Sequence, residues 1–263
     1  MLPAQLTRLR SQINILKTKF SESKEFELSI LSFLKLYALE KRNEKFWVPE
    51  ETTLPHMHIP DSVMLELIMQ IGIVAKIKPK AALRNADLLW ASEFYEMKYI
   101  AISMLANLAE THPHQVIERI HHWIQSGVDN QLMNDIMKEF EHKSHILLNR
   151  EWIGLLASWL DSADEELVRL GLRAMRHTIE MGYDNLPYIF SILSSIIRQP
   201  NFSIQKYLIE LIKALINKSE AETASFLIAT GKLNPEIDVN VFIRKCLPLF
   251  DPFFQGEILA GLQ

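Results

Sequence analysis

The sequence predicts an all-α protein made of stacked helix pairs, and three observations favour this fold class. First, Leu, Ile, Ala, Met, Glu and Lys dominate the chain, and these residues suit helices. Second, the 263 residues include only 8 glycines, too few for glycine-rich nucleotide-binding turns or a hairpin-rich sheet. Third, apolar residues recur at helical spacing almost everywhere, as at Phe26, Ile30, Phe33 and Tyr37. We expect at least ten helices and no substantial sheet.

The first 60 residues are expected to form two helices and a long loop. Apolar periodicity predicts helices over 4–20 and 22–42. The stretch from 43 to 60 lacks this periodicity and contains Pro49, Pro55 and Pro60, so it is predicted to be irregular.

The rest of the chain is expected to be a series of helices. Residues 61–232 form the central repeats, and residues 233–263 form C-terminal helices of the same single domain, which covers 1–263. The predicted helices cover 61–76, 80–90, 93–110, 113–126, 130–142, 146–160, 164–181, 185–198, 203–217, 220–230 and 237–248, with a short one after Asp251.

Local signals support several helix ends. Asp164 precedes two glutamates and suits an N-cap, while Pro113 and Pro187 suit first turns. Gly182 and Gly231 suit helix C-termini.

From Glu93 onward the helix pairs begin afresh at intervals of about 34 to 39 residues. Such intervals are typical of helical solenoids, in which helix pairs stack and one helix of each pair lines a concave surface. The Trp, Gly and Tyr pattern of tetratricopeptide repeats is absent from the sequence. We therefore expect an α-α superhelix of HEAT-like helix-pair repeats.

Composition limits the compartment and the partners. The formal net charge is -4, which by itself favours no polyanion, although the charge of one face is what a polyanion meets. No apolar run approaches the roughly 20 residues of a membrane span. The single cysteine, Cys246, cannot form an internal disulfide, and the N-terminus lacks a signal-peptide pattern. We expect a cytoplasmic monomer without a membrane segment or a cofactor.

Three consecutive helices are predicted to carry polar or basic stripes in register. On the helix from Asp164 the stripe is formed by arginines at i, i+4 and i+7, which share one helix face. Such stripes suit the phosphates of a nucleic-acid backbone, and solvated outer faces give the same pattern. The stripes are Arg169, Arg173 and Arg176; Lys206, Glu210 and Lys213; and Asn134 or Asp135 with Lys138 and His142.

Residues 201–213 read Asn-Phe-Ser-Ile-Gln-Lys-Tyr-Leu-Ile-Glu-Leu-Ile-Lys. This segment is similar to the "FFIQKAIGWALR" signature of the AlkD-type DNA alkylation repair glycosylase family, whose members are HEAT-like solenoids. Residues 89–105, which begin Leu-Trp-Ala-Ser, resemble its "LW.S..YE.RY.ALDLL" helix. Trp159, followed ten residues later by Arg169, is similar to its "W…WLQRTAI" helix. The resemblance covers roughly residues 61–232.

The resemblance implies a basic cleft that holds duplex DNA and removes alkylated bases without flipping them into a pocket. The family uses two tryptophan faces, a carboxylate and an arginine for this reaction. Arg169 matches the arginine. Glu210 stands where one tryptophan is expected. When the family's "SWWDTVD" motif is aligned without a gap from Ser126, its essential tryptophan falls on Val128, its first aspartate on Asp129 and its catalytic aspartate on Leu132. When positions are instead counted back from Arg169, the catalytic carboxylate falls on Asn134, beside Asp135.

Loss of the aromatic half of such a site removes most of the rate, because contributions of residues that act together are not additive. Our hypothesis is a DNA-binding member of this family without the standard base-excision activity. An active alkylpurine glycosylase is one alternative, in which Asp129, Asp135 or Glu210 supplies the negative charge. A scaffold that binds a protein segment in the same groove is the other.

The histidines and the tryptophans are expected to have structural rather than functional roles. The nine histidines include a pair at i, i+3, His142 and His145, but no cysteine lies nearby, so we expect no metal site. Trp152 and Trp159, seven residues apart, share one helix face and are expected in the core. Trp47, at the edge of the long loop, could fill the core or contact a groove.

Overall fold

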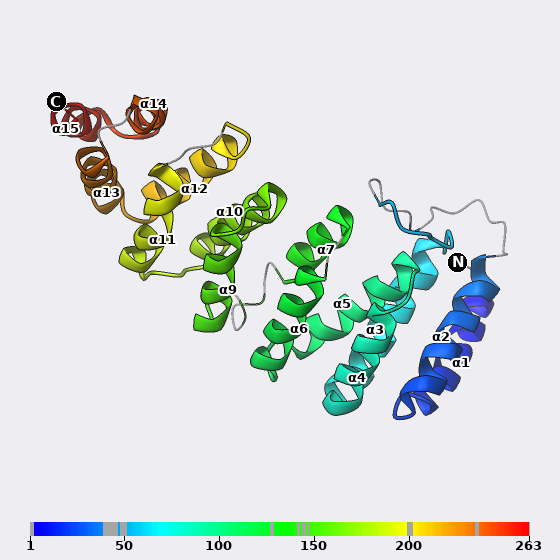
Figure 1. Ribbon diagram of the computed structural model, residues 1–263. Helices are drawn as coiled ribbons and strands as arrows, with labels where there is room; N and C mark the ends of the chain where they lie inside the picture. The colour runs from blue at the N-terminus through cyan, green and yellow to red at the C-terminus, as the bar shows by residue number, and fades with distance from the viewer. Residues whose placement is uncertain are drawn as a thin grey trace. The chain divides into compact units, whose positions relative to one another are not determined.

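A computed structural model describes residues 3–38, 47, 52–126, 129–140, 143, 146, 148–198, 202–234 and 237–262. This part of the chain forms fourteen α-helices and one short 3-10 helix, with no strand (Figure 1). The predicted all-α class is confirmed. The chain divides into two compact units, residues 1–146 and 147–263.

The described residues of the first unit form seven helices whose contacts follow chain order. Helix α1 contacts α3, α2 contacts α4, α3 contacts α5, and α5 contacts α7, so these helices meet their counterparts two positions along the chain. This pattern is what stacked helix pairs produce. The helices are α1 (Pro3–Thr18), α2 (Ser23–Ala38), α3 (Asp61–Ile77), α4 (Pro79–Trp90), α5 (Tyr95–Leu108), α6 (Pro113–Gln125) and α7 (Asn130–Phe140).

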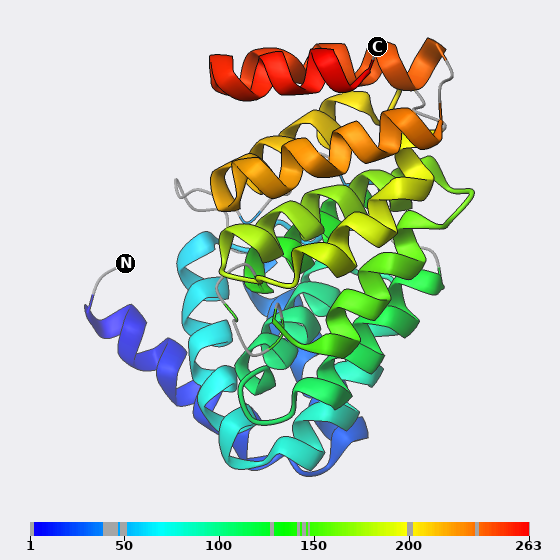
Figure 2. The same cartoon turned by 90° about the vertical axis from the view of Figure 1, so that its left-hand side faces the viewer.

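The second unit repeats this pattern. Helix α10 contacts both α9 and α12, α11 contacts α13, and α13 contacts α15, in the layered order visible from α9 to α15 in Figure 2. The elements are α9 (Arg150–Leu160), α10 (Glu165–Glu180), α11 (Leu186–Arg198), α12 (Gln205–Lys218), α13 (Glu220–Leu233), α14 (Ile237–Cys246), the 3-10 helix η1 (Leu247–Leu249) and α15 (Pro252–Gly261).

Most of the predicted helix ends are observed. The Asp164 side chain accepts the N–H of Glu166 at 2.9 Å and caps α10, whose other end is followed by Gly182 with φ 111°. Helix α9 begins at Arg150 rather than at 146, because Asn149 accepts the N–H of Glu151 and caps it.

Gly231 does not end its helix, as the sequence predicted, because α13 continues to Leu233. A Cβ atom at Gly231 would lie 2.2 Å from a methyl carbon of Leu262 and 3.1 Å from one of Ile243. Close packing of neighbouring segments, rather than a helix end, explains this glycine.

The paired tryptophans of α9 lie in the core of the second unit, as predicted. Trp152 and Trp159 are 0% and 1% exposed, and their rings meet edge to face with centroids 5.7 Å apart. Trp152 Nε1 donates a hydrogen bond to Thr178 Oγ1 at 3.2 Å, which fixes α9 against α10. Both side chains are therefore unavailable for stacking on a base.

The segment 52–60 is irregular, as predicted, and it is bonded to α5. Met57 N donates to Glu96 Oε1 at 2.7 Å, and Tyr95 N donates to the carbonyl of Pro55 at 3.0 Å. Trp47 N donates to the carbonyl of Ile59, and the Trp47 ring packs on Tyr99 with centroids 4.9 Å apart. The other residues of the predicted 43–60 loop, 43–46 and 48–51, lie outside the described residues.

Two negative predictions can be compared with the structure. Within the described ranges, no helix has the length and apolar character needed to cross a bilayer. No group of three His, Cys, Asp or Glu side chains able to hold a metal ion occurs there either. His142 and His145, the pair noted in the sequence, lie outside the described residues.

Candidate nucleic-acid interface

Two of the predicted stripes lie on neighbouring helices of the second unit. Arg169, Arg173 and Arg176 belong to α10, and α10 packs against α12, which carries Lys206, Glu210 and Lys213. Arg176 Nη1 lies 2.9 Å from Glu210 Oε2, so an ion pair joins the two stripes directly. The register inferred from the repeat interval therefore places these side chains on one surface of the unit.

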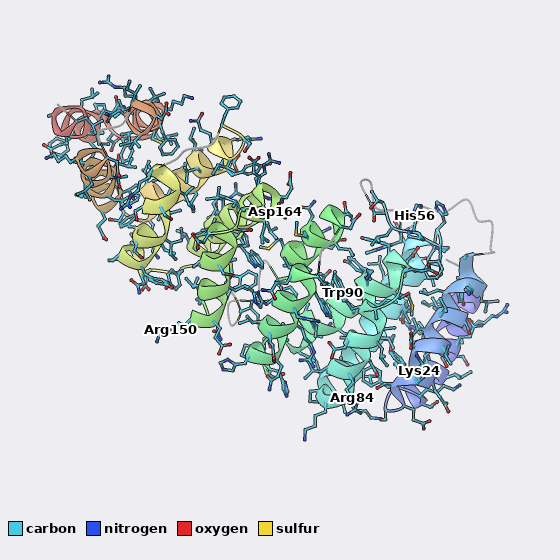
Figure 3. The ribbon with its side chains drawn as sticks, in the orientation of Figure 1. Lys24, His56, Arg84, Trp90, Arg150 and Asp164 are labelled. Atoms are coloured by element: carbon cyan, nitrogen blue, oxygen red, sulfur yellow. The ribbon has the colours of Figure 1, made fainter. Side chains whose placement is uncertain are left out.

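Arg169 is bound to the acidic first turn of its own helix. Its guanidinium forms an ion pair with Glu166 and a longer one with Glu165, at 3.5 Å. Asp164, labelled in Figure 3, caps the same turn. A phosphate would have to displace these carboxylates to reach Arg169.

The remaining cations on the two stripes face solvent. Arg173, Lys206 and Lys213 are exposed. No ion pair with Lys206 or Lys213 occurs among the described residues. The surface also carries Glu180, which lies 3.5 Å from Arg176 Nε. Five cationic and four anionic side chains thus share it, with the exposed positive charge at Arg173, Lys206 and Lys213.

A pocket of about 350 Å³ opens beside the first turn of α10. Its lining is more polar than apolar and includes the carboxylates of Asp161 and Glu165, so this end of the surface favours cations over phosphates. The lining residues are Leu160, Asp161, Ser162, Ala163, Glu165, Val168, Ser195, Ile196 and Ile204.

The third predicted stripe belongs to α7 in the first unit. Lys138 is exposed there, Asn134 is partly buried, and Asp135 is 7% exposed. His142 lies outside the described residues, so only part of this stripe can be traced.

Asp129, the first candidate carboxylate, anchors two backbone segments. Its Oδ2 accepts the N–H and the hydroxyl of Thr53 at 2.9 and 3.0 Å, and its Oδ1 accepts the N–H of Gln131 at 2.9 Å, at the start of α7. Partial burial opposes the charged carboxylate, but the hydrogen bonds from Thr53, Gln131 and Leu132 outweigh it and lower the pKa of Asp129. This is the chemistry of a helix cap.

Asp135, the second candidate, is held inside the first unit. The hydroxyl of Tyr95 donates to its Oδ2 at 2.7 Å, and Gln131 Nε2 donates to its Oδ1 at 3.0 Å. Burial raises the pKa of Asp135, and these two hydrogen bonds only partly oppose the rise. Burial and the neighbouring carboxylate likewise raise the pKa of Tyr95.

A second tyrosine–carboxylate bond runs parallel to the first and was missed in the sequence. Tyr99, one turn after Tyr95, donates its hydroxyl to Glu139 Oε1 at 2.7 Å. Both bonds join residues 40 positions apart, one on α5 and one on α7. We call these two bonds the tyrosine–carboxylate ladder. The shared spacing of four residues, in Tyr95/Tyr99 and in Asp135/Glu139, is the sequence pattern that could have predicted it.

The residues at the expected tryptophan and catalytic aspartate positions, Val128 and Leu132, are both aliphatic. Leu132 is 1% exposed and packs in the core. Val128 lies outside the described residues. Glu210, at the position of the other tryptophan, is engaged by Arg176.

Glu96 is a buried carboxylate that the sequence did not single out for chemistry. It is fully buried, its Oε1 accepts the Met57 amide, and its Oε2 has no hydrogen-bond partner within the described structure. Burial raises the pKa of Glu96, while that amide and the nearby His56 and His58 oppose the rise. His56 is labelled in Figure 3.

Trp90 is also committed internally. Its ring stacks on Trp123 with centroids 4.2 Å apart, and Lys98 Nζ lies 4.7 Å from the centre of the Trp90 ring. Burial lowers the pKa of Lys98. Trp90, the tryptophan of the 89–105 segment, therefore packs between α4 and α6.

The sequence was compared with known proteins. It matches the family model described as "DNA alkylation repair enzyme" over residues 67–240. The match spans α4 to α13, and with them both basic stripes and both candidate carboxylates. Comparison with curated proteins gives no match.

Proposed function

Since the chain belongs to the DNA alkylation repair enzyme family, we propose that it binds duplex DNA through the exposed cations of α10 and α12 and does not excise alkylated bases by the family's aromatic-and-carboxylate route. The observation that carries the proposal is the shared surface of Arg173, Lys206 and Lys213, whose register is set by the Arg176–Glu210 ion pair.

Cations spaced along adjacent helices suit a phosphate backbone, because each one that meets a phosphate releases a condensed counterion. Glu165, Glu166, Glu180 and Glu210 neutralise much of the charge of Arg169 and Arg176. The affinity is therefore expected to be modest, sensitive to salt and largely independent of sequence, since phosphate contacts carry no base information.

The state of the candidate catalytic groups supports the absence of standard excision. Asp129 is used as a helix cap, and Asp135 is buried beneath Tyr95. Neither side chain presents an unengaged carboxylate for an oxocarbenium-like sugar, and Glu210 is paired with a guanidinium.

The chemistry is tested by incubating the protein with duplex DNA that contains methylated purines and measuring base release. We expect release at the spontaneous rate. Release above that rate, abolished by Asp129→Asn, Asp135→Asn or Glu210→Gln, would favour the active-glycosylase alternative.

Binding is tested separately by mobility shift with duplex, branched and single-stranded DNA at low and moderate salt. We expect duplex binding at low salt that weakens as salt rises. No binding at low salt would favour the scaffold alternative, in which the same surface receives a protein segment.

The compartment in which we place this activity is the cytoplasm. Cys246, the single cysteine of the sequence, is buried, and burial raises the pKa of its thiol to about 12. Such a thiol is unreactive and forms no disulfide, which suits a reducing compartment.

A further inference from the structure

Helix α3 exposes a row of large apolar side chains that no described element covers. Leu65, Met69, Ile73 and Ile77 are 57%, 49%, 50% and 71% exposed. They follow one another at intervals of four residues, so they form one continuous ridge along the helix. We call these four residues the α3 ridge.

The opposite side of α3 is apolar as well. Val63, Met64, Leu67 and Ile71 are buried and pack in the core of the first unit. A helix at a protein surface usually keeps one apolar face and one polar face, whereas a helix that is apolar on both sides is covered on both. A contiguous exposed apolar patch of this kind marks an interaction surface.

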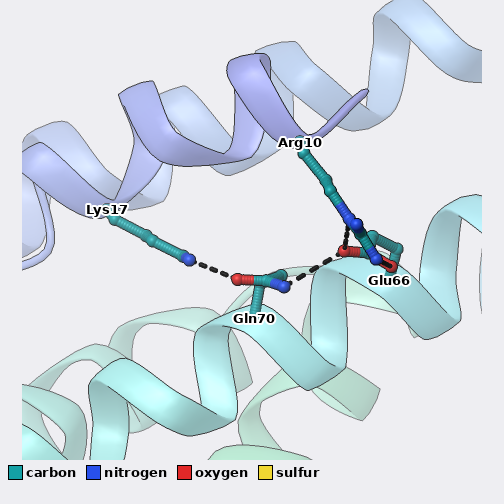
Figure 4. Close-up of polar contacts among 4 residues, drawn as sticks. All are labelled: Arg10, Lys17, Glu66 and Gln70. Carbon is teal, nitrogen blue, oxygen red and sulfur yellow. Dashed lines mark hydrogen bonds and ion pairs between the residues drawn. The ribbon is translucent and has the colours of Figure 1, made fainter. Parts of the chain in front are cut away.

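The neighbouring helix α1 is held beside the α3 ridge and does not cover it. Arg10 Nε lies 2.8 Å from Glu66 Oε1, Lys17 Nζ donates to Gln70 Oε1, and Gln70 Nε2 donates to Glu66 Oε1 at 3.1 Å (Figure 4). This polar row follows α3 next to the ridge and forms one of its borders. An incoming partner would therefore meet an apolar strip with charged groups at its edge.

The charges on α3 and just after it are polarised along the helix axis. Asp61 lies at the N-terminal end, where Glu66 is already paired with Arg10, whereas Lys76, Lys78 and Lys80 lie at or beyond the C-terminal end. A second α3 running antiparallel would place the basic end of one copy against the acidic end of the other. The two helix dipoles would also be opposed, which is the favourable arrangement.

The ridge fits its own antiparallel copy residue by residue. A two-fold axis midway between Met69 and Ile73 brings Met69 opposite Ile73 of the second copy, and Leu65 opposite Ile77. The same axis brings Asp61 of one copy toward Lys80 of the second copy. Ridges of residues four apart interdigitate when two helices cross at about 50°. The pairing is isologous, so it closes at two copies.

We propose that the α3 ridge is a self-association surface through which two copies of this chain form an antiparallel dimer. The occupant is a second copy rather than another protein because the charges along α3 complement those of α3 itself. The interface is small, so the dimer is expected to dissociate on dilution. The proposal does not depend on DNA binding, which is assigned to the second unit.

Sedimentation equilibrium of the full chain tests the dimer, over a range from about 1 µM to about 200 µM because small interfaces associate weakly. We expect the mass to rise toward twice that of the monomer. The variant Met69→Lys/Ile73→Lys should remain monomeric throughout. The control variant Leu28→Lys/Leu36→Lys changes two exposed apolar side chains of α2, 55% and 45% exposed, and should dimerise normally.

A monomer at the highest concentration would overturn the proposal, and so would a dimer that persists in Met69→Lys/Ile73→Lys. Circular dichroism checks that the variants fold, which is expected because the changed side chains are exposed. Lys80→Glu should weaken the dimer several-fold, because it brings a carboxylate toward Asp61 of the second copy.

Disulfide trapping tests the antiparallel direction. Chains carrying Met69→Cys are mixed with chains carrying Ile73→Cys under mild oxidation, and mixed disulfides should form faster than either homodimer. Faster Met69→Cys homodimers would show a parallel arrangement and contradict the proposed pairing. Buried Cys246 is common to all chains and does not affect the comparison.

Discussion

Arg176 and Glu210 form an ion pair across 34 sequence positions, with Nη1 2.9 Å from Oε2, and this pair joins α10 to α12. Both side chains are partly exposed, at 35% and 37%, so the pair contributes less than about 1 kcal/mol to stability. Its larger effect is on the surface charge, because Glu210 neutralises an arginine of the surface that we propose binds DNA.

Glu210→Gln is therefore expected to raise the affinity for duplex DNA several-fold at low salt, because it removes a negative charge and one of the two carboxylates that pair with Arg176. The gain should shrink as salt rises. Fluorescence anisotropy with a labelled duplex measures both effects. Glu257→Gln, an equal charge change at an exposed position on α15, is the control and should leave binding unchanged. Weaker binding of Glu210→Gln would contradict the assignment.

Asp129→Ala is expected to lower the free energy of unfolding by about 1 to 2 kcal/mol at pH 7, since it removes the cap of α7. It also removes the two hydrogen bonds from Thr53. The pKa of Asp129 is lowered in the folded state, so this stabilisation is complete above about pH 4 and is lost as the pH falls further.

Chemical denaturation at pH 7 and pH 3 measures the effect of Asp129→Ala. Asp251→Ala is the matched control, because Asp251 precedes α15 without a side-chain cap bond and should cost much less. A cost for Asp129→Ala that does not shrink at pH 3 would contradict the role assigned to the ionised carboxylate.

Tyr95→Phe is expected to destabilise the protein by about 1 to 3 kcal/mol, because it deprives the buried Asp135 of a donor. Tyr99→Phe should cost less, since Glu139 is only partly buried and water can replace the lost hydroxyl. Thermal unfolding of the two variants makes the comparison. An equal or larger cost for Tyr99→Phe would contradict the ladder as described.

Glu96→Gln tests the buried carboxylate with the unpartnered oxygen. The pKa of Glu96 is raised on folding, so the native state favours the proton, and stability falls as the pH rises through the range above about 4. Glutamine keeps an acceptor for the Met57 amide and does not titrate. As the pH rises from 4 to 8, the variant should become more stable relative to the unchanged protein. A difference in stability that stays constant over this range would contradict a raised pKa of Glu96.

The helices could be predicted because they depend on local patterns, namely apolar periodicity and caps such as Asp164. The repeat interval aligned Glu210 with Arg173, whereas the ion pair between α10 and α12 joins Glu210 to Arg176. The role of Gly231 was predicted wrongly, because the residue must be small to leave room for Leu262, which is distant in sequence.

The carboxylates could not be interpreted from sequence for the same reason. Whether Asp129 is catalytic or a cap depends on Thr53, which lies 76 positions away, and whether Asp135 is accessible depends on Tyr95. Periodicity identifies which face of a helix a residue occupies, but the partner on that face comes from tertiary packing. The exposed face of α3 illustrates this limit, since the sequence predicted a helix there but not which of its apolar residues would be exposed.

The most direct test of the DNA-binding claim is the salt dependence of duplex binding by Arg173→Ala/Lys206→Ala/Lys213→Ala. Three phosphate contacts predict a slope of about -2.7 for the logarithm of the binding constant against the logarithm of the salt concentration. The variant should bind weakly with a slope near zero, while Lys35→Ala/Arg84→Ala/Lys232→Ala, an equal loss of exposed charge elsewhere, should keep the original slope. An unchanged affinity and slope in the first variant would contradict the account.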